Sequence, residues 1–201
     1  MYGIWDGSKV IGTFVAPMTV RSNQPVFVSD TLSLSRKIMR RTAQRWEIET
    51  AIKPETREAN TLMVDLITKG YSEIVEVLMP QNSGVLQQRA GGAEVRASGG
   101  QGSSQITITP PGGLVPMGTF IRFDNHPKVY ITTTDVAAGN TVGIFPALRV
   151  AVVGGVGVGT IMTYMDDVIA NMRYDTDVVS GMSYTDGILM DPGTIKLVEA
   201  L

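Results

Sequence analysis

Residues 41–80 read RTAQRWEIETAIKPETREANTLMVDLITKGYSEIVEVLMP, and this stretch decides the expected fold. Its first part alternates between two sets of side chains, namely Thr42, Gln44, Trp46, Ile48 and Thr50 against Arg41, Arg45, Glu47 and Glu49. A period of two residues is typical of a β-strand with one buried face. We therefore predict a long strand over residues 41–52, with Trp46 and Ile48 facing the core.

A helix and a second strand are expected to follow. Between Pro54 and Lys69 the apolar residues recur at the spacing of one helical stripe. Pro54 suits the first helical position, and Gly70 can adopt the left-handed conformation that ends many helices. The mostly apolar run EIVEVLMP, residues 73–80, is predicted to be a strand that Pro80 ends. The three elements together predict a compact helix packed on a sheet.

The composition changes after Pro80. Residues 81–105 are rich in Gly, Ser and Gln and poor in apolar side chains, so we place a domain boundary there. Short β-type runs bounded by Gly, Pro or Asn then follow at Gln105–Thr109, Thr119–Asp124, Lys128–Thr134 and Thr141–Phe145. About five such strands without a helix predict a small barrel.

The C-terminal stretch is predicted to return to the first domain. Strands are expected at Val168–Tyr174 and near Met182–Tyr184, Ile188–Met190 and Ile195–Val198. If they complete the sheet begun before Pro80, the small barrel is an insertion. The predicted fold is mainly β with one helix, in two domains. A β-barrel or sandwich assembly domain would span residues 1–80 and 164–201, and a small inserted barrel residues 81–163.

Length and composition restrict the class of protein. The chain has 201 residues, 43% of them hydrophobic, enough for one large core or two small ones. Its formal charge is −2, so no net charge attracts it to nucleic acid or to an anionic membrane. The lack of Cys excludes disulfides, thiolate metal sites and cysteine nucleophiles. Pro, Arg and Gly interrupt the longest weakly polar run, residues 144–165, and the N-terminus lacks a basic and then apolar pattern. Neither a membrane span nor an export signal is expected.

Three stretches carry a resemblance to a known family. The first stretch consists of AQRWEIETAIKPE, the predicted helix and SEIVEVLMPQ, and it is similar to a strand, helix and strand of that family. GQGSSQITI and GTFIRFDNHPKVYITTT are similar to the start of its second domain, and IFPALR, residues 144–149, to a strand end. The match spans Ala43 to Arg149, and His126–Tyr130 is its most specific segment. On these residues the chain resembles the distal tail proteins of siphophages, especially those of T5-like phages.

The resemblance implies a structural virion protein rather than an enzyme. It implies a ring-forming first domain, an inserted oligonucleotide- and oligosaccharide-binding-type (OB) barrel, and a hexamer at the tail tip or baseplate. The implied partners are further copies of the chain, the tail tube protein, the baseplate hub protein and the tape measure protein. Assembly would take place in the host cytoplasm. No cofactor, metal, membrane or specific nucleic acid is expected.

The candidates for catalysis have simpler explanations. His126 is the only histidine, and turn chemistry explains Asn-His-Pro between two strands better than a Ser-His-Asp site does. One His without Cys leaves a zinc site short of ligands. The run VVGGVGVGT, residues 152–160, lacks the Gly-Lys-Ser/Thr ending of a phosphate-binding loop and the spacing of a dinucleotide fingerprint. We favour a flexible connection there over a phosphate loop followed by a helix.

Paired carboxylates are a second group of candidates. A glycosidase needs two carboxylates across a cleft, and a Ca²⁺ site needs a full loop of oxygen ligands. Aspartates at strand ends and turns are normally solvated, which is the interpretation we favour. The pairs are Asp166 with Asp167, Asp175 with Asp177, and Asp186 with Asp191.

A run of five cations is the strongest charge feature. It consists of Arg36, Lys37, Arg40, Arg41 and Arg45. The run is either a solvated strand face or a contact with a ring neighbour or the tail tube, because Arg is favoured at protein interfaces. DNA binding is disfavoured, since no aromatic residues are interleaved. We select Arg40, Arg41 and Arg45 as interface residues.

The small barrel offers an alternative function. Its expected outer positions are Arg122, Lys128, Tyr130 and Arg149. Barrels of this type often bind sugars or single-stranded nucleic acid. A virion component that binds or hydrolyses host carbohydrate is therefore the main alternative to a ring subunit, and a single-strand-binding protein is the third.

Overall fold

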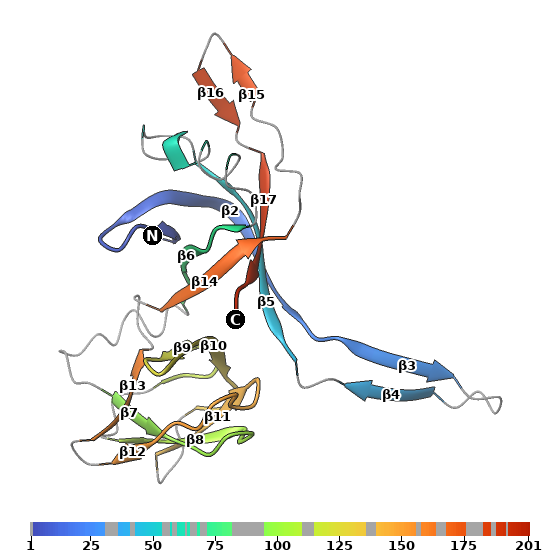
Figure 1. The fold of residues 1–201 in the computed structure, drawn as a ribbon, viewed down its shortest axis with the longest axis vertical. Coiled ribbons are helices and arrows are strands. Elements are labelled where there is room, and N and C mark those ends of the chain that lie inside the picture. Colours follow the sequence, from blue (N-terminus) through green and yellow to red (C-terminus); the bar gives the residue numbers. More distant parts are fainter. Residues whose placement is uncertain are drawn as a thin grey trace.

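The computed structural model describes most of the chain. The described part comprises residues 2–30, 36–40, 43–53, 57, 60–62, 64, 68, 72–81, 95–109, 115–135, 140–155, 158–163, 168–175, 183–185, 188–191 and 193–201. The protein is mainly β, as predicted, and its strands close two six-stranded barrels (Figure 1). No described helix is long and apolar enough to cross a membrane.

The first barrel draws its strands from both ends of the chain. All neighbouring strands are antiparallel, in the closed order β1-β2-β5-β17-β14-β6. The strands are β1 (Gly3–Trp5), β2 (Val10–Asn23), β5 (Arg45–Ile52), β6 (Val75–Leu78), β14 (Ile169–Tyr174) and β17 (Thr194–Glu199). The predicted strand at 73–80 is confirmed. Of the four predicted C-terminal strands, those at β14 and β17 pair within this barrel, whereas the other two form a separate two-stranded sheet.

Strand β5 shows why the alternating pattern was informative. Trp46, Ile48, Thr50 and Ile52 are buried, whereas the residues between them are partly or fully exposed. The strand lies between β2 and β17, so its inward side chains fill the barrel core. The prediction that Trp46 and Ile48 face the core is confirmed.

The predicted helix is only partly within the described residues. Those residues of it that are described, 57, 60–62, 64 and 68, are helical. Leu62 is buried and packs against the first barrel at Gly12, where an added Cβ would lie 2.7 Å from Cδ2 of Leu62. Because Gly12 has no side chain, the helix can approach β2 closely at this position.

The second barrel is formed by the middle of the chain. Its strands are also antiparallel, in the order β13-β7-β8-β11-β10-β9, and pairing of β9 with β13 closes the ring. Its strands are β7 (Val95–Ser98), β8 (Gln105–Thr109), β9 (Phe120–Phe123), β10 (His126–Thr132), β11 (Thr141–Phe145) and β13 (Val158–Thr163), and β12 (Gly154–Gly155) pairs beside β13.

Two strands of this barrel were not predicted. β7 lies in the Gly-, Ser- and Gln-rich segment that we interpreted as a domain boundary, and β13 lies in the run that we interpreted as a flexible connection. That second interpretation is wrong for residues 158–160. Thr160, Ile161 and Met162 pair with β7, so long-range backbone pairing rather than local composition makes this segment a strand.

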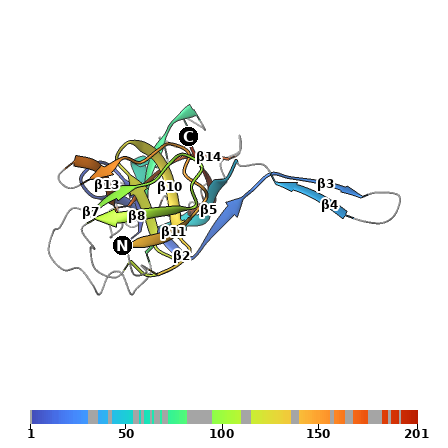
Figure 2. The ribbon, with the colours of Figure 1, turned by 90° about the horizontal axis from the view of Figure 1, so that it is seen from below.

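Two hairpins extend from the first barrel. One consists of β3 (Val26–Asp30) and β4 (Arg36–Arg40), and it lies between β2 and β5 in the sequence. The other consists of β15 (Ser183–Thr185) and β16 (Ile188–Asp191), close to the predicted positions. Both views show β3 and β4 projecting far from the two barrels (Figures 1 and 2). We call the β3–β4 hairpin the arm.

Candidate functional site

A buried ion pair lies at the joint between the two barrels. The Nζ atom of Lys128, on β10, bonds to Oε2 of Glu199, on β17, and donates to Oε1 of Gln44 at 2.6 Å. The carboxylate of Glu199 also accepts the backbone N–H groups of Val129 and Trp46, at 2.9 and 3.2 Å. Neither charged side chain is more than 1% exposed. The charges are therefore neutralised and hydrogen-bonded within the protein, as buried charges must be.

Burial dominates the electrostatics of this pair. It lowers the pKa of Lys128 from 10.5 to about 8, although the charge and hydrogen bond of Glu199 act in the opposite direction. The ammonium group also lies 5.9 Å from the centre of the Trp46 ring, which favours a cation over the ring face. Glu199 therefore favours the charged form of Lys128 and opposes the effect of burial on its pKa.

Further hydrogen bonds cross the joint. Nε1 of Trp46 donates to the carbonyl oxygen of Val129 at 2.8 Å. The side-chain amide of Gln81 makes two hydrogen bonds to the backbone of Phe120, at 2.8 and 3.0 Å. Nη1 of Arg122 donates to the carbonyl oxygen of Ile169 at 2.8 Å. Phe120 and Val129 pack into the core of the first barrel, so the two barrels share apolar surface as well.

Two of the four expected outer positions of the small barrel are buried. Lys128 is 1% exposed and Tyr130 0% exposed, so the prediction that they form its outer surface is wrong. Tyr130 points into the core of the second barrel, and Lys128 is covered by the first barrel. The register of β10 is irregular between His126 and Val129, so simple alternation does not hold there. Arg122 and Arg149 are partly exposed.

His126 is part of a hydrogen-bonded chain within the second barrel. Asn125 donates through Nδ2 to the carbonyl oxygen of Ala151, so its Oδ1 atom is the acceptor for Nδ1 of His126, at 2.5 Å. The hydroxyl oxygen of Tyr130 accepts the backbone N–H of Arg149 at 3.1 Å, and the hydroxyl is then free to donate to Nε2 of His126 at 2.7 Å. This order of donors defines a neutral imidazole protonated on Nδ1.

The surroundings of His126 explain its structural role. The ring stacks on Phe123 at a centroid distance of 5.7 Å. Burial lowers the pKa of His126 below 6.5, and the positive charges of Arg122 and Arg149 lower it further. Both ring nitrogens already have partners, which leaves neither for a catalytic serine or a metal ion. The interpretation of His126 as a structural histidine is the one this geometry favours.

The free energy of unfolding is expected to fall as the pH is lowered from 7.5 to 5.5, a range of about one pH unit either side of the pKa of a free histidine. Below pH 6.5 the unfolded chain binds a proton on His126 that the folded chain, with its lower pKa, excludes. His126→Phe should remove this slope. It should also lower the free energy of unfolding by about 1–3 kcal/mol at pH 7.5, because Tyr130 and Asn125 lose a buried partner. Urea unfolding followed by circular dichroism at each pH measures both effects. An unchanged slope in the variant would contradict the assignment.

The carboxylate pairs show no catalytic arrangement where they are described. Asp175 bonds to Nζ of Lys196 at 2.5 Å, which is a surface ion pair. Of the other pairs, Asp166, Asp167, Asp177 and Asp186 lie outside the described residues. In the part of the chain that the structure describes, no group of three or more His, Asp or Glu side chains is placed to hold a metal ion.

The arm exposes apolar side chains on both of its faces. Val28 lies opposite Ile38, and Phe27 lies opposite Met39. These four side chains are between 46% and 71% exposed, and Val26 is 47% exposed. An isolated two-stranded hairpin is at best marginally stable in water, and contiguous exposed apolar side chains mark interaction surfaces. The arm is thus the described element best suited to contact another protein.

The two predicted interface arginines that the structure describes lie at the base of the arm. Arg40 is the last residue of β4, Arg41 lies outside the described residues, and Arg45 begins β5 with an exposed side chain. Arg36, at the distal end of β4, makes a long 4.0 Å ion pair with Asp30. Arg45 lines a pocket at the joint together with Arg149 and Arg173. Their role in an interface stays a prediction.

Neither a protein-family model nor a curated protein sequence matches this chain.

Proposed function

We propose that the chain is a structural subunit of a phage tail tip that assembles into a ring, each arm packing on a neighbouring copy. The exposed apolar arm is the single observation that carries this proposal. It projects from the barrels in both views (Figures 1 and 2). A partner that covers it removes large apolar side chains from water, which favours association. Contact between unlike surfaces of successive copies closes a ring when the rotation from one copy to the next returns the last copy to the first.

The joint between the barrels supports the same proposal. The buried ion pair and the backbone hydrogen bonds around it hold the two barrels in one fixed arrangement. A ring subunit needs this rigidity because a small angular error between domains repeats at every subunit. The resemblance to siphophage distal tail proteins is the second support, and it suggests the tail tube and hub proteins as neighbours and a hexamer as the ring.

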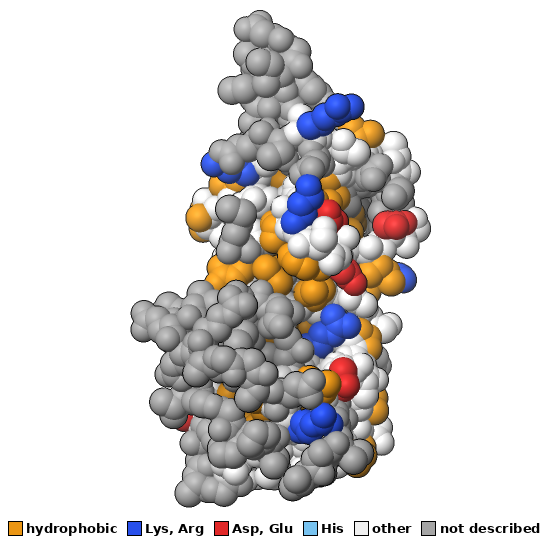
Figure 3. Space-filling model, turned by 90° about the vertical axis from the view of Figure 1, so that its left-hand side faces the viewer, with side chains coloured by type: hydrophobic (Ala, Val, Ile, Leu, Met, Phe, Trp, Pro, Cys, Tyr) orange, Lys and Arg blue, Asp and Glu red, His pale blue; other side chains and the backbone are white. Residues whose placement is uncertain are grey.

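The alternative functions have less support from the described residues. Tyr130, the aromatic platform expected for sugar binding on the small barrel, is fully buried. On the face drawn in Figure 3, Lys and Arg side chains of the described residues stand apart from one another among Asp, Glu and apolar side chains. Single-strand binding uses a continuous basic groove with exposed aromatics. We therefore favour assembly over recognition of carbohydrate or nucleic acid.

Light scattering of the purified chain across a concentration series tests the proposal. Wild type is expected to form a ring-sized species. The variants Val28→Ser with Ile38→Ser, and Phe27→Ser with Met39→Ser, each remove one apolar face of the arm. Each should weaken assembly at least about a hundredfold, since a large apolar side chain contributes about 1.5–3 kcal/mol when buried.

Met117→Ser is the matched control. Met117 is 61% exposed on the second barrel, so its replacement changes surface hydrophobicity without touching the arm. It should leave the mass unchanged, and all variants should keep the circular dichroism spectrum of wild type. A ring that persists in both arm variants would refute packing through the arm. A wild-type monomer at every concentration would refute self-assembly.

A further inference from the structure

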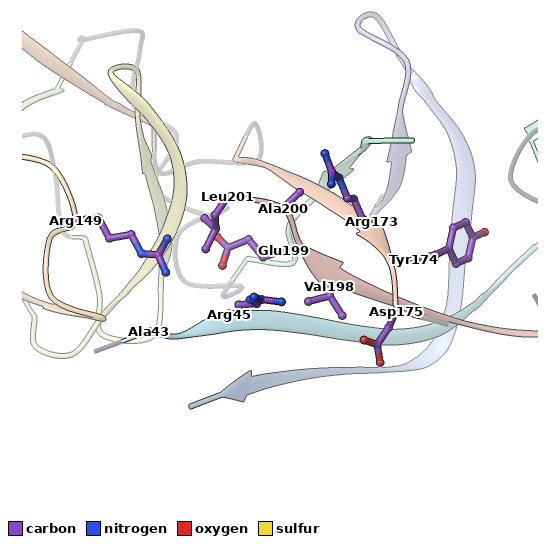
Figure 4. Close-up of a pocket in the computed structure, with 10 residues that line it drawn as sticks. All are labelled: Ala43, Arg45, Arg149, Arg173, Tyr174, Asp175, Val198, Glu199, Ala200 and Leu201. Carbon is purple, nitrogen blue, oxygen red and sulfur yellow. The ribbon is translucent and has the colours of Figure 1, made fainter. Parts of the chain in front are cut away.

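A pocket of about 590 Å³ lies at the joint beside the base of the arm. Figure 4 shows Arg149 reaching from the second barrel toward Arg45 and the end of β17. Arg173, on β14, is the third arginine that lines it. The three arginines thus come from three segments far apart in the sequence. The volume falls within the range of pockets that hold small ligands or peptide side chains.

The carboxylates of the pocket are already neutralised. Glu199 is bonded to Lys128, and Asp175 is bonded at 2.5 Å to Lys196, whose ammonium group also lies 3.8 Å from Glu47. By contrast, no described carboxylate lies within ion-pair distance of the guanidinium groups of Arg45, Arg149 and Arg173. A carboxylate at Leu201, the last residue of the sequence, would offset only one of these charges. The pocket therefore carries a net positive charge.

A second pocket provides a comparison. It lies on the first barrel between β2 and β5 and has a volume of about 410 Å³. Its one arginine, Arg21, is paired with Glu49 at 3.2 Å, so that pocket is close to neutral. This second pocket thus lacks the unpaired arginines of the joint pocket. They form a distinct electropositive site.

We propose that the joint pocket binds a carboxylate-rich segment of a partner protein. A guanidinium group matches a carboxylate with two parallel hydrogen bonds, and several spaced arginines match several acidic side chains of one extended segment. Val198 and Leu201 add apolar contact for the rest of such a segment. Arg45, which lines the pocket, follows the last residue of β4 by five residues, so the pocket is close to the arm along the chain. A protein seated along the arm would reach it. The site does not depend on the proposed ring, because its charge belongs to a single copy.

Isothermal titration calorimetry of the full chain with hexaglutamate, a hexaglutamine control and inorganic phosphate tests this inference. Arg149→Gln and Arg173→Gln should each weaken hexaglutamate binding about tenfold or more, since a hydrogen bond to a charged group contributes about 1.5–3 kcal/mol. Arg21→Gln, which removes an arginine outside the pocket, should change it less than about twofold (a surface ion pair contributes little). Binding should weaken at high ionic strength.

Each other outcome overturns the inference. Equal weakening in the Arg21→Gln control would mean non-specific attraction to positive charge. Tighter binding of phosphate than of hexaglutamate would mean a site for inorganic or phosphate-bearing anions, and no binding of either would mean that the pocket has no such ligand. Thermal unfolding of each variant checks that it folds. The arm variants should bind hexaglutamate as wild type does, so failure of the ring proposal and failure of this inference are distinguishable.

Discussion

Replacing Glu199 with Gln is expected to lower the free energy of unfolding by about 3–5 kcal/mol, the loss typical of breaking one partner of a buried ion pair. The carboxylate accepts three donors, from Lys128, Val129 and Trp46. A carboxamide has one oxygen and a donating nitrogen, so at least one donor faces another donor. Lys128 is also left as an uncompensated buried cation. Urea unfolding followed by circular dichroism measures the loss.

Two comparisons isolate the effect of burial. Glu49→Gln breaks the exposed pair with Arg21, at 60% and 42% exposure, and should change stability by less than about 1 kcal/mol. Combining Lys128→Met with Glu199→Gln removes the unpaired cation, so the double variant should lose less than the sum of the two single variants, with a coupling energy of about 0.5–3 kcal/mol. A loss in Glu199→Gln no larger than in Glu49→Gln would show that the ion pair does not stabilise the joint.

Trp46→Ala is the other substitution with a large expected effect, a loss of about 3–5 kcal/mol of unfolding free energy. The indole ring is in edge contact with Phe120 and Phe145, at centroid distances of 5.3 and 6.4 Å, and it donates to Val129. All three partners belong to the second barrel, so the truncation leaves a cavity between the barrels. We expect calorimetry to show two separate unfolding transitions in place of one, because the barrels then lose much of their coupling.

Conservative variants of the two tryptophans serve as controls. Trp46→Phe keeps most of the ring and removes only the bond to Val129, so it should lose about 1–3 kcal/mol. Trp5→Phe, on the partly exposed end of β1, should lose less than either. If Trp46→Ala unfolds in the same single transition as wild type with a similar midpoint, the two barrels are not coupled through Trp46.

The sequence contains a signal for the exposed arm. Val26, Phe27 and Val28 are consecutive apolar residues, and Ile38 and Met39 are adjacent in β4. A strand with one buried face alternates, whereas an apolar run on both faces indicates a strand covered on both sides. In the described part of the structure, the four apolar side chains on the two faces of the arm are between 46% and 71% exposed, so the arm presents apolar surface to solvent.

Lys128 and Glu199 show the limit of sequence reasoning for the joint. Both residues are charged, and from the sequence alone they are expected at the surface, because charged side chains are seldom fully buried unless paired. Their pairing spans 71 residues, and the bond from Lys128 to Gln44 spans 84. No local pattern links positions so far apart. β10 is buried on both faces, one in its own barrel and one against the other barrel. A period-two pattern therefore does not indicate which of its side chains are buried.

The sequence by itself determined the β class, most strands and the inward face of β5, because alternation, turn residues and helix spacing are local properties that neighbouring residues impose on the backbone. The tertiary structure alone decided that residues 95–98 and 158–163 are strands, that Lys128 is buried and that three arginines line one pocket. Each of these results depends on pairing or contact between distant segments, and the free energy of such contacts is fixed only when the chain has closed both barrels.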